Sequence, residues 1–231
     1  MTSDLGPHLT IQGVRVPSLM YGTAWKEEHT EALVGLALAA GFRAIDTANQ
    51  RKHYFEAGVG AALRASGVAR ADLFLQTKFT SRSGQDHRLP YDAAAEVATQ
   101  VRQSFTSSLE HLGVDVIDSY VLHGPSAGQG WHHEDRATWR AMEELHGEGR
   151  ARLLGVSNVS LAQLSTLCQE ASVAPAFVQN RCYARTGWDR DVRALCRDRG
   201  IVYQGFSLLT ANRRELANDC CTWMVTSAAG S

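Results

Sequence analysis

The chain has 231 residues, of which 44% are apolar, and this is enough for one domain with a sizeable core. Fibrous, disordered and disulfide-scaffold classes are therefore excluded. A formal net charge of -1 leaves no electrostatic footprint for nucleic acid or for an anionic membrane surface. No apolar run is long enough to span a bilayer, and residues 1–8 show no secretory signal. We therefore expect a cytoplasmic protein without nucleic-acid or membrane partners.

Short β-branched or aromatic runs alternate along the chain with longer stretches of helical period, which indicates repeated βα units. A small hairpin is expected first, over residues 8–17, with its turn at Gln12-Gly13. Apolar residues at helical spacing predict helices that include 30–40, 93–112 and 191–199. The seven expected strands are 19–25, 44–48, 74–79, 117–123, 152–158, 177–183 and 201–207.

Two folds satisfy this pattern, an open doubly wound sheet and a closed (β/α) barrel. The dinucleotide fingerprint of the doubly wound sheet is poorly met. Its GxG element occurs as Gly58-Val59-Gly60 inside a helical stretch, where we assign it to helix packing. In a barrel, the long loops at 80–92 and 124–135 would lie at the active face, because they follow the third and fourth strands.

Polar side chains stand at the carboxyl ends of the expected strands, where the apolar runs stop. In a barrel all of these ends meet at one mouth. A single polar residue in such a place often anchors a loop, whereas the whole set together indicates a functional site. Its members are Asp46 and Thr47, Lys78, His123, Ser157 and Asn158, and Gln179 and Asn180.

Lys78 stands out because 20 of the 23 basic residues are Arg and three are Lys. A lysine in an apolar strand needs a partner carboxylate, and Asp46 on the neighbouring strand is the candidate. That pair alone would fit a structural role equally well. A nearby phenol would make it catalytic, since an ammonium group lowers the pKa of a phenol from about 10. Tyr54, eight residues beyond Asp46, is placed to reach the same mouth.

These residues and their neighbours resemble the signature of the aldo-keto reductase family, over about residues 9–218. The resemblance implies an α/β fold, the (β/α)8 TIM barrel, with seven of its eight βα units recognisable and an N-terminal β-hairpin. It also implies reduction of aldehyde or ketone carbonyls to alcohols with NADPH as the cofactor. It is carried by Gly41-Phe42-Arg43-Ala44-Ile45-Asp46-Thr47-Ala48, then Tyr54, Glu56 and Val59-Gly60, by Lys78 after Phe-Leu-Gln-Thr, by Tyr120-Val121-Leu122-His123-Gly124-Pro125, and by Gly155-Val156-Ser157-Asn158.

Carried over residue by residue, the resemblance implies a catalytic tetrad of Asp46, Tyr54, Lys78 and His123, with Tyr54 as the proton donor. Ser157, Asn158 and Gln179 would hold the nicotinamide carboxamide, and the Phe206 ring would stack on the nicotinamide. The complete set of expected cofactor-binding residues is Gly22, Thr23, Asp46, Ser157, Asn158, Gln179, Phe206, Ser207 and Leu209.

Three aromatic residues, Trp25, Phe79 and Trp131, are expected to form the walls of an apolar substrate pocket. No metal site is expected, since the run His132-His133-Glu134-Asp135 reads as a solvated loop. The five scattered cysteines fit a reducing compartment better than a disulfide framework.

The sequence also departs from the family pattern in three places. Phe206 stands where most members have a tyrosine, and its phenyl ring would still stack. Arg51 occupies the usual position of the tyrosine, five residues after the aspartate, so Tyr54 requires a longer loop. Within the single expected domain, 1–231, no family feature is recognisable over 219–231. We interpret this tail either as a makeshift eighth strand near 221–226 or as the divergent end of a truncated barrel. A truncated barrel would self-associate through its open edges, because unpaired strands are templates for pairing.

The alternative function therefore belongs to a different class. A barrel without its closing strand would be a catalytically inactive module that binds a nucleotide or a protein, or a non-functional product.

Overall fold

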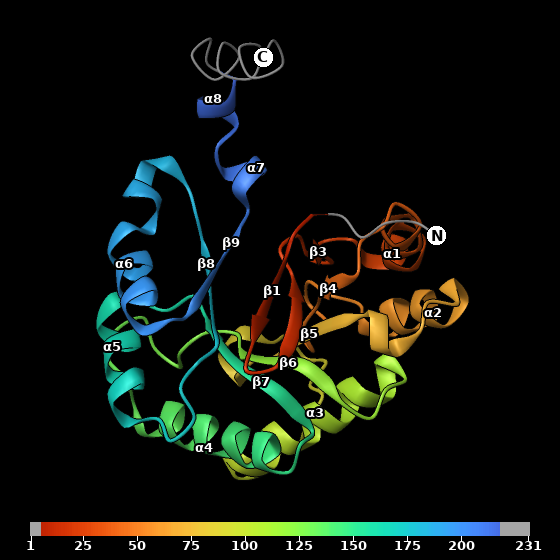
Figure 1. Cartoon of the computed structure of the whole chain (residues 1–231). Coiled ribbons are helices and arrows are strands. Elements are labelled where there is room, and N and C mark those ends of the chain that lie inside the picture. The colour runs from red at the N-terminus through yellow and green to blue at the C-terminus, as the bar shows by residue number, and fades with distance from the viewer. Residues whose placement is uncertain (1–5, 218–231) are drawn as a thin grey trace.

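The structure is a computed structural model that describes residues 6–217. Its main element is a seven-stranded parallel sheet in which the strands lie side by side in chain order. The strands are β3 (Tyr21–Gly22), β4 (Ala44–Asp46), β5 (Phe74–Phe79), β6 (Ile117–Leu122), β7 (Ala151–Ser157), β8 (Phe177–Arg181) and β9 (Val202–Phe206). The sheet is curled, and helices cover its outer surface (Figure 1).

The helices fill the connections between strands, as expected for right-handed parallel crossovers. The longer ones are α1 (Thr30–Ala39), α2 (Glu56–Ser66), α3 (Val97–Leu112), α4 (His133–Gly147), α5 (Leu161–Glu170) and α6 (Arg190–Arg199). Short helices follow β9, namely α7 (Leu208–Ala211) and α8 (Arg213–Leu216). Single 3-10 turns occur at Glu27–His29, Arg70–Asp72 and Arg82–Gly84, and Ala184–Asp189 is 3-10 in part, with non-helical residues at Thr186, Gly187 and Trp188.

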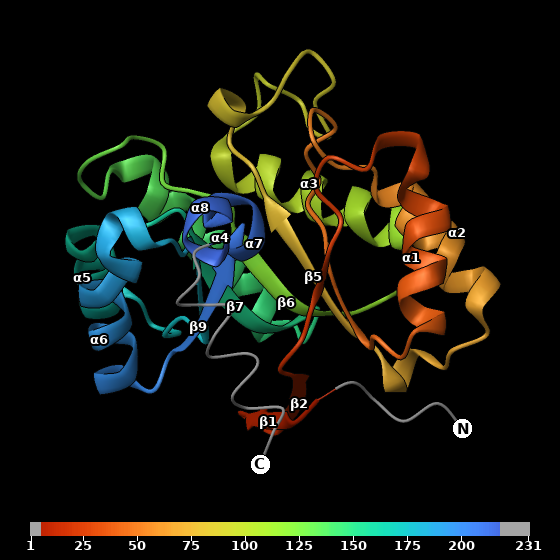
Figure 2. The ribbon, with the colours of Figure 1, turned by 90° about the horizontal axis from the view of Figure 1, so that it is seen from above.

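An antiparallel hairpin of β1 (His8–Ile11) and β2 (Val14–Pro17) covers the end of the sheet at which the strands begin (Figure 2). Val16 of the hairpin packs with the first residues of three strands, Ala44, Phe74 and Phe177, in an interior apolar cluster. A larger apolar cluster lies between the outside of the sheet and the helices. Because the hairpin closes one end, the polar side chains at the other end of the strands are left to form the mouth of the curled sheet.

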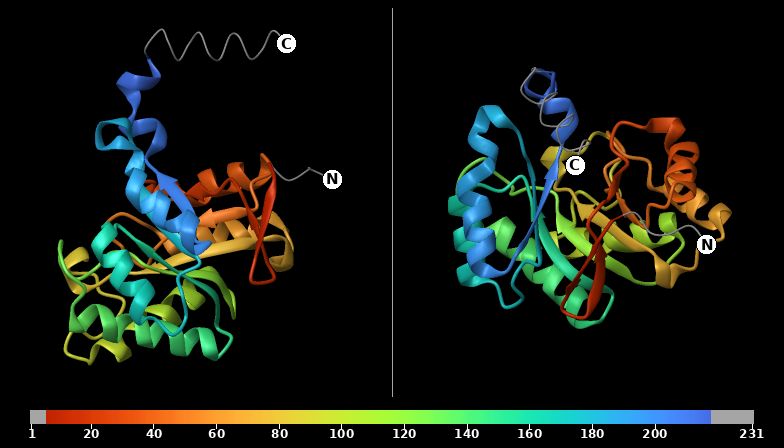
Figure 3. Two further views of the ribbon diagram at one scale, coloured as in Figure 1. Left: turned by 60° about the vertical axis from the view of Figure 1, so that its left-hand side comes forward. Right: turned by 45° about the horizontal axis from the view of Figure 1, so that its top comes forward.

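Within residues 6–217 the sheet stays open between β3 and β9, which are its two outer strands (Figure 3). A cavity of about 470 Å³ lies in this opening, lined by the segment from Val16 to Met20 on one side and by the β9 strand on the other. The expected tail over 219–231, including its possible strand near 221–226, falls outside the described residues.

All seven strands predicted from the sequence are present and in the predicted order, as is the hairpin. The first strand is shorter than the predicted 19–25. The chain leaves the sheet at Thr23, whose main-chain N–H and hydroxyl both donate to the Asp46 carbonyl. The predicted helix over 93–112 begins later, at Val97. Asp92 explains the delay, because its carboxylate accepts from the Ala94 N–H and holds a turn there.

The prediction of a solvated loop through Asp135 is wrong, because α4 begins at His133. Asp135 lies in the first turn of this helix and is 2% exposed. Its carboxylate accepts from the main-chain N–H groups of His132 and Ser126, at 2.7 and 2.6 Å, so it both caps the helix and anchors the preceding loop.

The assignment of Gly58-Val59-Gly60 to helix packing agrees with the structure, since all three lie in the buried side of α2. A methyl group at Gly60 would overlap the main-chain carbonyl oxygen of His111 in α3. We therefore expect Gly60→Ala to lower the free energy of unfolding by about 1–3 kcal/mol, as overpacking does. Denaturant titration measures the change.

A matched control is available in α1, where nothing lies within 4 Å of a methyl group added to Gly35. Gly35→Ala should raise stability by about 0.5–1 kcal/mol, because glycine is entropically unfavourable in a helix interior. Equal effects of the two substitutions would contradict the close approach of α2 and α3.

Candidate active site

A buried lysine and a carboxylate lie at the mouth of the curled sheet, at the ends of adjacent strands β4 and β5. The Lys78 ammonium donates to Asp46 Oδ1 at 2.7 Å and to the Thr47 carbonyl at 2.8 Å. Its side chain is 1% exposed, and that of Asp46 is 13% exposed. The parallel register of β4 and β5 pairs Asp46 with Gln76, and Lys78 follows two residues later on the same face of β5, within reach of Asp46 as the sequence predicted.

Tyr54 lies above this pair although its loop is longer than the family interval. The Lys78 Nζ atom is 5.2 Å from the centre of the Tyr54 ring. The loop returns to the mouth because the Tyr54 N–H donates to the Gln50 carbonyl, and the Gln50 side-chain amide donates to the Gly84 carbonyl. The extra residues are therefore absorbed in a turn held by its own hydrogen bonds.

His123 completes the cluster from the end of β6. Its ring meets the Tyr54 ring edge-on at a centroid distance of 5.7 Å, and its Nδ1 is hydrogen-bonded to the Thr80 hydroxyl at 2.7 Å. Burial, reinforced by the charge of Lys78, lowers the pKa of His123 to about 3. The imidazole is therefore neutral near pH 7.

The electrostatics of Tyr54 and Lys78 are set by burial and by each other. Burial alone would lower the pKa of Lys78, but Asp46 and Tyr54 raise it above its ordinary value. Burial raises the pKa of Tyr54, and Lys78 opposes this effect. The lowered phenol pKa expected from the sequence is therefore not the outcome, since burial outweighs the nearby ammonium group. At neutral pH the site holds a charged lysine, a neutral phenol and a neutral imidazole.

The residues predicted to hold the nicotinamide lie beside this cluster, on β7, β8 and β9. The Ser157 hydroxyl donates to the Gln179 carbonyl at 2.6 Å. The Asn158 amide donates to the His123 carbonyl at 2.8 Å and to the Ser157 hydroxyl at 3.1 Å. Asn158 adopts a positive φ of 52°, a backbone conformation that asparagine tolerates well. These contacts tie the predicted cofactor residues to the predicted tetrad.

The cavity between β3 and β9 collects most of the remaining predicted cofactor residues. Gly22, Asp46, Gln179, Phe206 and Ser207 all line it. An amide, a carboxylate and an aromatic ring in a cavity of about 470 Å³ suit a flat polar ring such as nicotinamide, so the residues present fit that end of the cofactor. Thr23 is buried behind the cavity, and Leu209 is 73% exposed on α7 and does not line it.

The three aromatic residues predicted for the substrate pocket lie in different places. Trp25 is 69% exposed and its ring stacks on His53 at a centroid distance of 3.9 Å, beside the Tyr54 loop. Phe79 is buried in the core against the Tyr91 ring. Trp131 is buried and lines a separate cavity with Arg136 and Trp139. The structure therefore does not bring the three aromatic residues together in one pocket.

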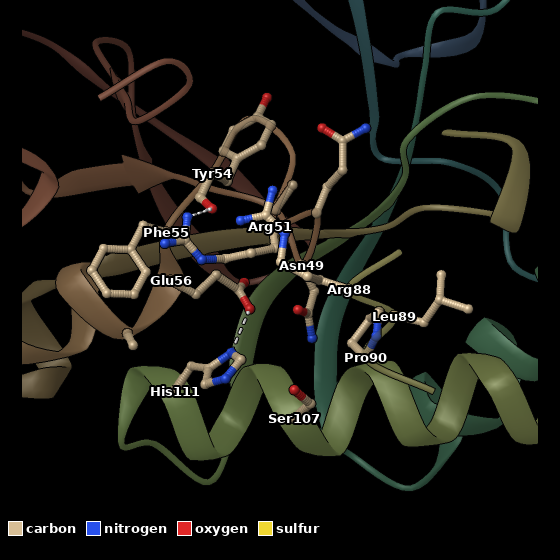
Figure 4. A pocket seen from close by; sticks show the side chains of 13 residues that line it. Asn49, Arg51, Tyr54, Phe55, Glu56, Arg88, Leu89, Pro90, Ser107 and His111 are labelled. Carbon is tan, nitrogen blue, oxygen red and sulfur yellow. Dashed lines mark hydrogen bonds and ion pairs between the residues drawn. The ribbon is translucent and has the colours of Figure 1, made fainter. Parts of the chain in front are cut away.

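Glu56, a buried carboxylate to which the sequence analysis assigned no role, lies behind the Tyr54 loop. It lines a cavity of about 310 Å³, from which the Tyr54 side chain points away (Figure 4). Glu56 accepts from the Thr77 and Ser108 hydroxyls and pairs with His111 Nδ1 at 3.3 Å. It therefore anchors the first turn of α2 to β5 and α3 and supports the loop from behind. The sequence offered one signal for a role of Glu56, namely its place two residues after Tyr54 in the family signature.

The pairing with Glu56 gives stability a pH dependence that can be measured. The hydrogen bond to Glu56 raises the pKa of His111 above its ordinary 6.5, against the effect of burial. A group whose folded pKa is raised stabilises fully below its unfolded pKa, and this stabilisation is lost as pH rises through the folded pKa. Between about pH 6 and pH 8, we expect the wild-type melting temperature to fall more than that of His111→Gln. Parallel melting curves for the two proteins would contradict the pairing.

Two negative findings concern the described residues. Within 6–217, no three His, Cys, Asp or Glu side chains come together as a metal site would require. No helix in the same part of the chain is both long and apolar enough to cross a membrane.

The curled parallel sheet has the topology of a (β/α) barrel, and a lysine, a carboxylate, a phenol and an imidazole meet at its mouth. The sequence model of the Aldo/keto reductase family matches residues 18–216. Because this match spans most of the chain, the chain belongs to the aldo/keto reductase family.

Among its relatives is a morphine 6-dehydrogenase of Pseudomonas putida, 37% identical over 169 residues, which are 72% of this chain and 51% of the relative. A glyoxal reductase of Bacillus subtilis is 33% identical over 199 residues, covering 85% of this chain and 65% of its own length. The chain thus spans about half to two thirds of the length of these two relatives.

Solved structures agree with this assignment. An aldo/keto reductase from Brucella melitensis superimposes with a TM-score of 0.78 at 31% identity, over 96% of this chain and 79% of the other. A Bombyx mori aldo-keto reductase in complex with NADP gives a TM-score of 0.70 at 26% identity, over 87% and 66%.

Proposed function

We propose that the chain reduces aldehyde or ketone carbonyls to alcohols with NADPH, and that Tyr54 is the proton donor. The observation that carries this proposal is the buried Lys78–Asp46 pair beneath Tyr54 and beside His123. An ammonium group held at 1% exposure has no need to be next to a phenol for stability alone. Its place there suits a site in which the phenol gives up a proton.

Bound nicotinamide would supply a hydride to the carbonyl carbon, and Gln179, Ser157 and Asn158 would hold its carboxamide. Tyr54 would donate its proton to the carbonyl oxygen as negative charge develops there. Lys78 would stabilise the phenolate that remains, and Asp46 keeps Lys78 charged. The neutral His123 would donate a hydrogen bond from its free ring nitrogen and orient the carbonyl.

The choice of NADPH is supported by the family and by the NADP complex of the Bombyx mori relative. Reduction of carbonyls is supported by the names of relatives such as the glyoxal reductase. The cavity between β3 and β9 supports binding of the nicotinamide end, because its lining offers carboxamides, hydroxyls and aromatic rings.

The test mixes the purified chain with NADPH and a reactive aromatic aldehyde such as nitrobenzaldehyde, and follows the near-ultraviolet absorbance of the reduced nicotinamide. Steady loss of absorbance, dependent on both reagents, supports the proposal. A change in nicotinamide fluorescence without turnover would instead identify a nucleotide-binding module, and no response of either kind would identify an inactive product. Repeating the assay with NADH decides the cofactor preference.

A further inference from the structure

A chain of polar side chains crosses the interior of the curled sheet beneath the predicted tetrad. Gln76 on β5 donates from Nε2 to Asp46 Oδ1 at 2.8 Å and to Gln204 Oε1 at 2.9 Å. Its Oε1 accepts from the Ser119 hydroxyl at 2.9 Å and from Gln204 Nε2 at 3.2 Å. Gln204 Oε1 also accepts from Gln179 Nε2 at 3.2 Å. This network of hydrogen bonds therefore runs from Asp46 to Gln179 through Gln76 and Gln204.

The two glutamines stand on strands that do not pair with each other. Three strands, β6 to β8, separate β5 from β9 in the sheet, so the contact between Gln76 and Gln204 passes through the interior. Gln76 is fully buried, and both ends of its amide are hydrogen-bonded. A leucine would fill the same place without requiring partners, whereas a buried amide stabilises only when its bonds are made. We therefore interpret this network as one that orients its neighbouring side chains and does not merely fill the interior of the sheet.

The first end of this network determines the orientation of the Asp46 carboxylate. The same oxygen, Oδ1, accepts from Lys78 Nζ and from Gln76 Nε2. Asp46 is the partly exposed member of the ion pair and borders the cavity between β3 and β9. Without the donor from Gln76, Lys78 alone would hold this oxygen, and the carboxylate would have more freedom to rotate toward that cavity.

The second end of the network determines the orientation of the Gln179 side chain. Gln179 is 7% exposed and lines the same cavity as Asp46. Because Gln204 accepts from one of its amide hydrogens, the Gln179 side chain is held in one rotamer. The two ends of the network are thus the carboxylate that controls Lys78 and the amide assigned to the nicotinamide.

We propose that Gln76 and Gln204 form an internal strut of positioning residues, which holds Asp46 against Lys78 and holds Gln179 in register with it. The strut fixes the proton-donating group and the cofactor-binding amide relative to each other. Gln76 is fully buried and does not line the cavity between β3 and β9, whereas Gln204 lines it together with Gln179. The catalytic consequence of the strut rests on the proposed carbonyl reductase activity, but its effect on Lys78 is independent of that activity.

The kinetic test uses Gln76→Met, which keeps the size of the side chain and removes both amide functions. At saturating NADPH we expect kcat to fall about tenfold, because Asp46 loses a hydrogen bond to its charged oxygen. Gln204→Met should raise the dissociation constant for NADPH about fivefold, since Gln179 loses its partner and the cavity loses the Gln204 carboxamide. Ser119→Ala is the matched control: it removes one bond to Gln76 but none to Asp46, and both constants should stay within about twofold.

A second readout separates positioning from packing and needs no turnover. The protein has three lysines, so isotope-labelled lysine gives an NMR spectrum in which the ammonium signal of Lys78 is resolved after assignment with Lys26→Arg and Lys52→Arg. Buried and paired, it should exchange slowly with water in the wild type and in Ser119→Ala. In Gln76→Met we expect it to shift and to exchange faster, because the Asp46 carboxylate is held less firmly against it.

An unchanged Lys78 signal in Gln76→Met overturns the proposal whether or not the wild type reduces carbonyls. So does an equal loss of kcat in Ser119→Ala, which would indicate general interior packing. If the wild type is inactive, the carbonyl reductase proposal fails alone, and the lysine spectrum still decides the strut. If Gln76→Met does not fold, Gln204→Met on the outer strand decides it: NADPH affinity and a Lys78 signal both as in the wild type would contradict the strut.

Discussion

Replacing Tyr54 by phenylalanine is expected to lower carbonyl reduction about a thousandfold, within the range for loss of a general acid. The phenyl ring can keep its edge contact with His123 and its place above Lys78, so the substitution removes the hydroxyl and little else. The affinity for NADPH should stay within about twofold, because no predicted cofactor contact involves the hydroxyl. Absorbance assays measure the turnover, and nicotinamide fluorescence measures the binding.

His53 provides the critical control, because it precedes Tyr54 in the loop and can also carry a proton. Its ring stacks on the exposed Trp25 and its Nδ1 is hydrogen-bonded to Gln50 at 2.8 Å. Burial lowers the pKa of His53, and the charge of Lys52 adds to this effect. We expect His53→Gln to retain activity within about threefold. Activity that survives Tyr54→Phe and disappears in His53→Gln would show that the proton donor is His53 and not Tyr54.

The βα repetition of the fold was predictable because it leaves local signals. Each buried parallel strand is a short apolar run, and each helix presents apolar residues at helical spacing. The errors fall where side chains bind the main chain. Asp135 caps α4, which begins at His133 and therefore inside the predicted loop, and Asp92 delays the start of α3. These effects depend on which of several nearby N–H groups a carboxylate reaches, which a hydrophobic pattern does not record.

Part of the candidate site was equally predictable. Adjacent parallel strands bring Asp46 and Lys78 together once both are assigned to strand ends, and the structure joins them at 2.7 Å. The position of Tyr54 was less certain, because the loop before it exceeds the family interval. Its return to the mouth depends on the bond from its own N–H to the Gln50 carbonyl. Such a turn has no strong signature in the run from Asn49 to His53.

The glutamine strut could not be predicted from the sequence at all. Gln76 and Gln204 are 128 residues apart and stand on strands that do not pair. A glutamine within an apolar strand carries no charge and fits no motif, so its partners become evident only when the sheet curls. The same holds for the Phe79 and Trp131 side chains, whose apolar character fits a pocket wall and a core equally well.

Replacing Asp46 by asparagine is expected to destabilise the fold by about 3 kcal/mol, because removal of one partner leaves the Lys78 charge buried and uncompensated. This figure lies at the lower end of the usual range because Asp46 keeps 13% exposure. Chemical denaturation at neutral pH measures the change. The double variant Asp46→Asn/Lys78→Met should recover most of the loss, since it removes the uncompensated charge as well.

The pH dependence gives this prediction a second and sharper form. In the wild type, Asp46 outweighs burial and the pKa of Lys78 is raised above 10.5, so its contribution to stability is lost only as pH rises beyond that value. In Asp46→Asn, burial acts with less opposition and the folded pKa of Lys78 should fall below the unfolded one. The unfolded chain then binds more protons, and stability must rise with pH up to the unfolded pKa. Between about pH 7 and pH 9.5 we therefore expect the variant to gain stability relative to the wild type. A constant difference would mean that the Lys78 charge reaches water in the folded protein, and it would remove the argument that this charge is buried beneath Tyr54.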